Sequence, residues 1–192
     1  SGQTLGARVE GIDLGTPLPD PDFRTLLRAL GQYGVLCFPR QMLEVPHFAA
    51  FGRRFGDLEI NVANLFHEPG FPEVMILSNM RGADGKPVGL NDAGQGWHTD
   101  MSYSKDIALA NILHAQRVPM RNGKSVGETQ FRNMHAAYDE LPDSLKDRLE
   151  GRTATHDFEK FWEVMRLRPG SGRKPLTEEQ KTAARTCFCM LA

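Results

Sequence analysis

The order of its helix-like and strand-like segments is the feature that most constrains how this chain can fold. Short apolar runs bounded by glycine, proline or serine, at 34–39 and 73–78, are typical of buried strands. Segments with apolar residues at helical spacing occupy 20–30 and 46–55. Strands and helices do not alternate regularly, however, and no glycine-rich phosphate loop is present, which disfavours a doubly wound nucleotide-binding fold. We therefore expect an α+β protein built on an antiparallel sheet.

The same signals predict further elements along the chain. We expect strands at 9–14, 107–118 and 152–158, and helices at 133–141, 142–149, 160–168 and 177–185. Residues 81–96 are rich in glycine, aspartate and asparagine, which predicts a loop with a tight turn at 83–86.

Composition narrows the class of function. A chain of 192 residues fits a single domain, which we expect to span 1–192. The 23 basic and 24 acidic residues nearly cancel, which argues against nucleic acid or an anionic membrane as partner and favours a small molecule. No apolar run approaches the roughly 20 residues needed to span a bilayer, and the first ten residues do not resemble a signal peptide. We expect a cytoplasmic protein.

One of the six histidines, His98, has a carboxylate two residues further on, at Asp100, in a segment expected to be extended. Residues i and i+2 of a strand point to the same face, so this imidazole and carboxylate should converge. With a second histidine they would form the two-histidine, one-carboxylate triad that suits non-haem Fe(II) and leaves three coordination positions open. Taken alone, such a pair is also compatible with a simple hydrogen bond on a surface strand.

The surroundings of this pair match a known pattern in order and spacing. The matching segments are Trp97-His98-Thr99-Asp100-Met101-Ser102-Tyr103, Gly127-Glu128-Thr129-Gln130-Phe131, Ala136-Ala137-Tyr138, Phe55-Gly56-Asp57-Leu58 and Thr155-His156-Asp157-Phe158. Over residues 5 to 185 the sequence resembles the taurine and 2,4-D dioxygenase family of Fe(II)- and 2-oxoglutarate-dependent oxygenases.

The resemblance implies a fold and a set of site residues. The fold is a double-stranded β-helix, or jelly roll, with flanking helices. The metal ligands are His98 and Asp100, and Thr129 binds the far carboxylate of 2-oxoglutarate. The substrate pocket is lined by Asn61, Asn64, Met101, Phe161 and Trp162. Because taurine-specific members have a histidine and a tyrosine in place of the two asparagines, taurine itself is disfavoured.

The reaction implied is hydroxylation of a small organic substrate with O2, with release of succinate and CO2 from 2-oxoglutarate. The family also carries a distal metal histidine and an arginine that binds 2-oxoglutarate in strands after the helix at 177–185, whereas no histidine follows His156 here. We therefore expect the C-terminal part of the domain to be missing. The alternative is a non-catalytic remnant or binding module. A homo-oligomer is left open.

Overall fold

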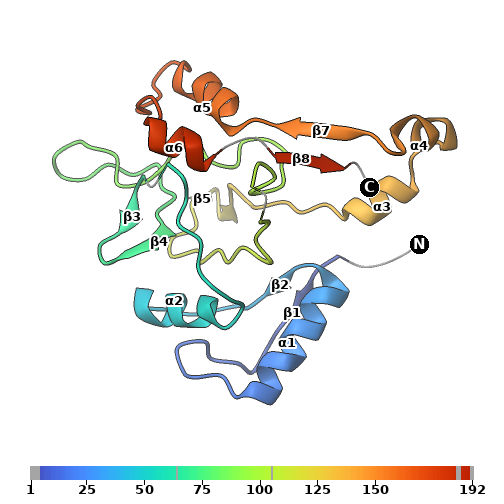
Figure 1. Ribbon diagram of the computed structural model, residues 1–192. Coiled ribbons are helices and arrows are strands. Elements are labelled where there is room, and N and C mark those ends of the chain that lie inside the picture. Colours follow the sequence, from blue (N-terminus) through green and yellow to red (C-terminus); the bar gives the residue numbers. More distant parts are fainter. Residues whose placement is uncertain (1–4, 64, 105, 185–186, 191–192) are drawn as a thin grey trace. The chain divides into compact units, whose positions relative to one another are not determined.

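The computed structural model describes residues 5–63, 65–104, 106–184 and 187–190, which combine helices with very short strands (Figure 1). The helices are α1 (Asp20–Tyr33), α2 (Val45–Arg53), α3 (Met134–Asp139), α4 (Asp143–Leu149), α5 (Phe158–Arg166) and α6 (Glu178–Ala183). The strands are β1 (Ala7–Arg8), β2 (Leu36–Cys37), β3 (His67–Glu68), β4 (Phe71–Met75), β5 (Met120–Arg121), β6 (Lys124–Ser125), β7 (Thr153–His156) and β8 (Cys187–Met190). None of the described helices is long and apolar enough to cross a membrane.

The strands of the described residues pair only two by two. β1 and β2 are parallel, whereas β3 with β4, β5 with β6 and β7 with β8 are antiparallel. The expected mixture of helix and strand is confirmed, and antiparallel pairing predominates. Two-stranded pairs do not amount to the two sheets of a jelly roll, so that finer part of the expectation stays a prediction.

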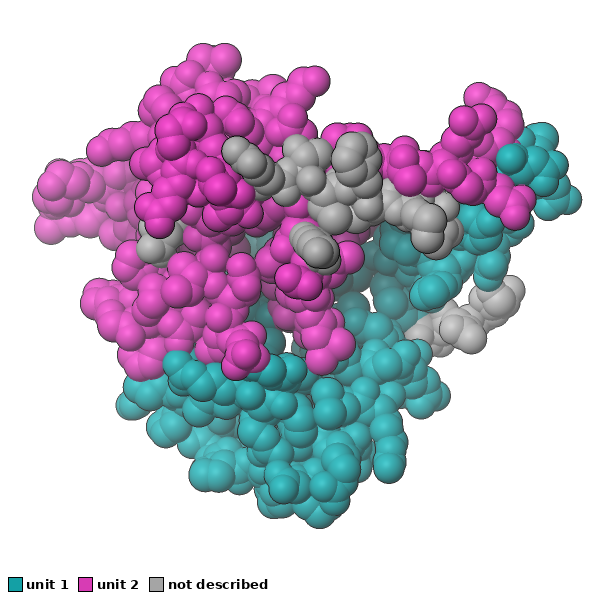
Figure 2. Space-filling view, in the orientation of Figure 1, with its two compact units in different colours: residues 1–56, 112–147 teal, residues 57–111, 148–192 magenta. Residues whose placement is uncertain are grey.

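The chain divides into two compact units, each built from two separate stretches (Figure 2). Unit 1 comprises residues 1–56 and 112–147. Its core consists of Leu14, Leu26 and Phe51, of which α1 contributes Leu26 and α2 contributes Phe51. α1 ends where Gly34 adopts φ +69°, a left-handed conformation that a residue with a side chain rarely takes. That turn directs the chain into β2.

Unit 2 comprises residues 57–111 and 148–192. Its core consists of buried residues from three stretches of chain, with Tyr103 and two aliphatic side chains packed around them; the buried members are Ala63, Phe158, Trp162, Leu176 and Ala184. Asp157 caps α5 by accepting from the backbone N–H of Lys160, and Thr177 caps α6 in a capping box. The helices that carry the core are thus started by their own local sequence.

The helix predictions are confirmed, with shifts of at most three residues at the ends, and residues 83–86 do form the tip of a turn. Two strand predictions are wrong. Residues 9–14 leave the strand after β1, because Gly11 takes φ +75° and the Asp13 carboxylate accepts from the N–H of Gly15 in a turn. Residues 107–118 have no neighbouring strand among the described residues and form no ladder.

Candidate functional site

His98 and Asp100 converge in unit 2. The Nε2 atom of His98 lies 3.1 Å from Oδ1 of Asp100, and both side chains are about half exposed. The segment is irregular rather than a strand, because Asp100 already begins a turn that closes with the Ser104 N–H donating to the Met101 carbonyl over 2.8 Å. The expected convergence is therefore present, in a segment that is not a strand.

The contact of Nδ1 selects the tautomer of the neutral His98 ring. Nδ1 lies 2.6 Å from the carbonyl oxygen of Gly96, and a carbonyl can only accept, so Nδ1 carries a hydrogen. In the neutral imidazole, Nε2 then presents a lone pair toward the Asp100 carboxylate. A lone pair on Nε2 and a carboxylate oxygen at this distance are two donors that one metal cation could bridge.

The donor set fits a divalent metal ion. Two ligand atoms, each about 2.1 Å from a metal and at about a right angle, lie about 3.0 Å apart, close to the 3.1 Å between His98 Nε2 and Asp100 Oδ1. One imidazole nitrogen and one carboxylate oxygen are also two of the three ligands of the facial iron triad. The described residues contain no cluster of three or more His, Cys, Asp or Glu side chains. They therefore supply two ligands of such a site.

Asn111 is a part of this site that the sequence analysis missed. Its side-chain Nδ2 donates to Oδ2 of Asp100 over 2.6 Å. The sequence does offer one signal, because Asn111 is the single polar residue in the apolar run 107–113. In a strand, such a residue would be assigned to the surface.

The loop that leads to His98 is held at its start by its own backbone. The N–H of Leu90 donates to the carbonyl of Ile76, and the N–H of Ser78 donates to the carbonyl of Leu90. Gly89 lies so close to this backbone that a Cβ atom there would stand 2.8 Å from both Ile76 O and Ser78 N. Only glycine permits this approach.

The loop is also tied to the chain that follows α5. Asp92 forms an ion pair with Arg173, whose guanidinium lies 5.2 Å from the ring centre of Trp162, and Arg168 reaches Gln95 at 3.4 Å. The segment that carries His98 is thus anchored a few residues before the candidate ligands.

The predicted substrate residues are spread between core and surface. Trp162 is buried in the core of unit 2, where its indole N–H donates to the carbonyl of Lys174 over 2.8 Å. Phe161, the next residue along α5 toward its start, is 54% exposed. Their proposed contacts with substrate stay predictions.

Asn61 and Met101, two further predicted substrate residues, lie on loops of unit 2. Asn61 uses its side-chain oxygen to accept from the N–H of Ala63 over 3.0 Å. Met101 is partly buried and takes φ +56°, a left-handed conformation uncommon for a residue with a side chain. Asn64 lies outside the described residues. The pocket assignment of these three residues also stays a prediction.

Tyr103 connects the turn after Asp100 with the core. Its ring centre lies 4.5 Å from that of Phe158. Burial raises the pKa of the Tyr103 hydroxyl above its usual value, and the nearby charges of Glu59 and Asp100 raise this pKa further. The phenol therefore remains neutral at physiological pH.

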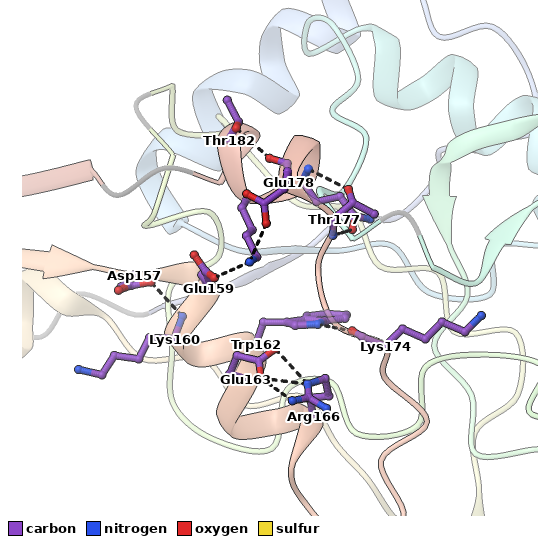
Figure 3. A network of polar contacts seen from close by, with 12 residues as sticks. Asp157, Glu159, Lys160, Trp162, Glu163, Arg166, Lys174, Thr177, Glu178 and Thr182 are labelled. Atoms are coloured by element: carbon purple, nitrogen blue, oxygen red, sulfur yellow. Dashed lines mark hydrogen bonds and ion pairs between the residues drawn. The ribbon is translucent and has the colours of Figure 1, made fainter.

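One ion pair joins α5 to α6, and others lie within each helix (Figure 3). The Lys181 ammonium bridges Glu159 at 3.2 Å and Glu178 at 3.0 Å, and hydrogen bonds to these carboxylates, chiefly that of Glu178, raise the pKa of Lys181. In α5 the guanidinium of Arg166 hydrogen-bonds Glu163 and lowers the pKa of that carboxyl. These contacts fix the helices and involve none of the candidate ligands.

Thr129 is exposed and lies in an irregular stretch of unit 1, whereas His98 and Asp100 belong to unit 2. Its role at the 2-oxoglutarate site stays a prediction.

The sequence of this chain is similar to those of several known proteins. Pentalenolactone F synthase from Streptomyces avermitilis is 30% identical over 84% of this chain and 53% of its own length. An alpha-ketoglutarate-dependent 2,4-dichlorophenoxyacetate dioxygenase from Cupriavidus pinatubonensis is 32% identical over 88% of this chain and 68% of its own length. The chain thus spans about half the length of the synthase.

A crystal structure from Burkholderia xenovorans, described as an alpha-ketoglutarate-dependent 2,4-D dioxygenase, superposes with a TM-score of 0.61 and 29% identity over 98% of this chain and 60% of that one. Residues 1–188 match the family model described as Taurine catabolism dioxygenase TauD, TfdA family. A sequence match over nearly the whole chain agrees with the fold and with the converging histidine and aspartate, and the chain belongs to the taurine catabolism dioxygenase TauD, TfdA family.

Proposed function

We propose that this chain binds Fe(II) and 2-oxoglutarate as part of a dioxygenase that hydroxylates a small organic substrate. The observation that carries the proposal is the approach of His98 Nε2 and Asp100 Oδ1 to 3.1 Å, with a hydrogen on the far nitrogen of the ring. The family match over residues 1–188 supports it independently.

The reaction balances as substrate C–H, O2 and 2-oxoglutarate giving substrate C–OH, succinate and CO2. When bound, the iron supplies the oxidising chemistry. His98 and Asp100 provide two of its ligands and so leave room for the co-substrate and O2. The Gly96 carbonyl keeps the hydrogen on Nδ1, which leaves Nε2 free to bind the metal.

Thr129 would donate its hydroxyl hydrogen to the far carboxylate of 2-oxoglutarate. Asn61, Asn64, Met101, Phe161 and Trp162 would line the substrate pocket. We further infer that the residues described here form part of a double-stranded β-helix domain. The superposition on a longer chain of the same kind over 98% of this one supports that inference.

For the substrate we propose a small carboxylic acid of the aryloxyacid type. Two relatives are named for 2,4-dichlorophenoxyacetate and (S)-phenoxypropionate, and each is 32% identical to this chain. Both named acids combine an apolar ring with one carboxylate. An aromatic side chain such as the exposed Phe161 suits the ring of such a molecule.

The direct test uses anaerobic protein with Fe(II) and 2-oxoglutarate. We expect a visible charge-transfer band that requires both components, and succinate formation with aryloxyacids when O2 is admitted. His98→Ala should remove the band. His135→Ala, at an exposed histidine of α3, is the matched control and should keep it. Absence of the band in the unaltered chain at saturating Fe(II) would favour the alternative of a non-catalytic binding module.

A further inference from the structure

The two oxygens of Asp100 have different partners. Oδ1 faces His98 Nε2 at 3.1 Å, whereas Oδ2 accepts from the side-chain amide of Asn111 at 2.6 Å. An ionised carboxylate only accepts hydrogen bonds, so the Asn111 group that faces it is the NH2 end of the amide. The short distance is typical of a charge-assisted hydrogen bond.

We propose that Asn111 is the positioning residue of the metal site, which holds the Asp100 carboxylate so that only Oδ1 is free to bind the metal. This inference rests on the proposed function. A carboxylate can bind a metal through one oxygen or through both. Occupying Oδ2 with a hydrogen bond favours the first mode, which keeps one more coordination position open for co-substrate or O2.

The exposure pattern around Asn111 places its side chain on one side of the segment. Between Ile107 and Leu113, exposure alternates with a period of two: Ile107, Leu109 and Leu113 are 62%, 71% and 62% exposed, and residues 108, 110 and 112 are partly buried. Asn111 lies on the exposed side of this segment, in register with the three apolar residues. It is the one polar side chain on that side, and it is the one that reaches Asp100.

The expected loss of metal affinity on removing the Asn111 amide depends on how exposed Asp100 is. Removing an outer partner of a metal ligand weakens metal binding by about 10–100-fold. Asp100 is about half exposed, so water can replace the lost amide in part. We therefore expect the lower end, about a tenfold loss of affinity.

The experiment is a titration with Co(II), a spectroscopic substitute for Fe(II), followed by visible absorption. Asn111→Leu keeps the side-chain size and removes the donor, and Asn111→Gln keeps the amide on an exposed side chain. Leu109→Ala, two residues earlier on the same side, is the matched control. Asp100→Ala reports on the site itself.

We expect Asn111→Leu to raise the Kd for Co(II) about tenfold and to change the shape of the visible bands, which report coordination number. Asn111→Gln should recover part of the affinity, and Leu109→Ala should behave like the unaltered chain. If Asp100→Ala abolishes binding but Asn111→Leu changes neither affinity nor spectrum, the positioning role is wrong and the proposed function stands. Equal losses in Leu109→Ala and Asn111→Leu would also overturn it. If Asp100→Ala itself binds Co(II) normally, the proposed site fails.

Discussion

Arg173 and Asp92, which are 81 residues apart in sequence, form an ion pair in the interior of unit 2. Their side chains are 6% and 18% exposed, and Nε of Arg173 and Oδ1 of Asp92 have no hydrogen-bond partner. The pair joins the loop before His98 to the chain after α5, but it leaves these two buried polar atoms without hydrogen bonds. It therefore fixes position at a considerable cost in desolvation.

This relationship predicts an asymmetric mutational response. Arg173→Met should lower the free energy of unfolding by about 3 kcal/mol, because it leaves the Asp92 carboxylate buried without its cation. The double variant Arg173→Met with Asp92→Leu should recover most of that loss, since neither charge is then buried. Urea denaturation of the two single variants and the double variant measures the coupling. Strictly additive losses would show that the pair does not hold the loop.

The candidate ligands predict a specific loss of metal binding. Asp100→Ala should raise the Kd for Fe(II) or Co(II) at least about tenfold, because a lone imidazole lacks a charged second ligand. Asp106→Ala, at an exposed carboxylate close by in sequence, should leave the Kd unchanged. Isothermal titration calorimetry distinguishes the two. Equal affinities in all three proteins would remove Asp100 from the site.

Helices and turns were predictable because their signals are local. Asp157 and Thr177 start α5 and α6 through hydrogen bonds to residues three positions away, and a turn at 83–86 needs only its own glycine and aspartate. Strands depend on a partner elsewhere in the chain. Residues 107–118 are apolar enough for a strand, yet no described strand pairs with them, so they form no ladder.

The site was predictable to the same extent. The convergence of His98 and Asp100 was expected from a strand, and the contact is present although the segment is not a strand. The contact with Asn111, eleven residues on, depends on how the chain folds back and has no local signature. The Asp92 ion pair with Arg173 is still more remote in sequence and could be found only in three dimensions.

Tyr103 predicts how stability depends on alkaline pH. Its pKa is raised in the folded chain, so its contribution to stability is fully present below the unfolded value of about 10 and is lost as pH rises toward the folded pKa. Unfolding free energy should therefore fall more steeply above about pH 10 in the unaltered chain than in Tyr103→Phe. Denaturation at a series of pH values tests the slope, and Tyr138→Phe serves as the control. Parallel slopes for Tyr103→Phe and the unaltered chain would contradict the prediction.

Thr129 predicts an effect on co-substrate affinity alone. Thr129→Val keeps the shape of the side chain and removes the hydroxyl, so binding of 2-oxoglutarate should weaken by about 1 kcal/mol, or roughly fivefold. Metal affinity should not change. Thr25→Val is a control in the same unit, because the Thr25 hydroxyl donates to the carbonyl of Pro21 within α1. Unchanged 2-oxoglutarate affinity in Thr129→Val would require a different residue at the co-substrate carboxylate.

Gly89 limits what variation the loop before His98 can accept. Every other amino acid would force a Cβ atom to within 2.8 Å of the main chain at Ile76 and Ser78, and the displaced loop would carry Asp92 away from Arg173. In a library that randomises residues 82–90 and selects for folded protein, the exposed turn tip at 84–85 should accept many sequences, whereas position 89 should return glycine alone. The path of this loop toward the candidate ligands is thus specified by the absence of a single methyl group.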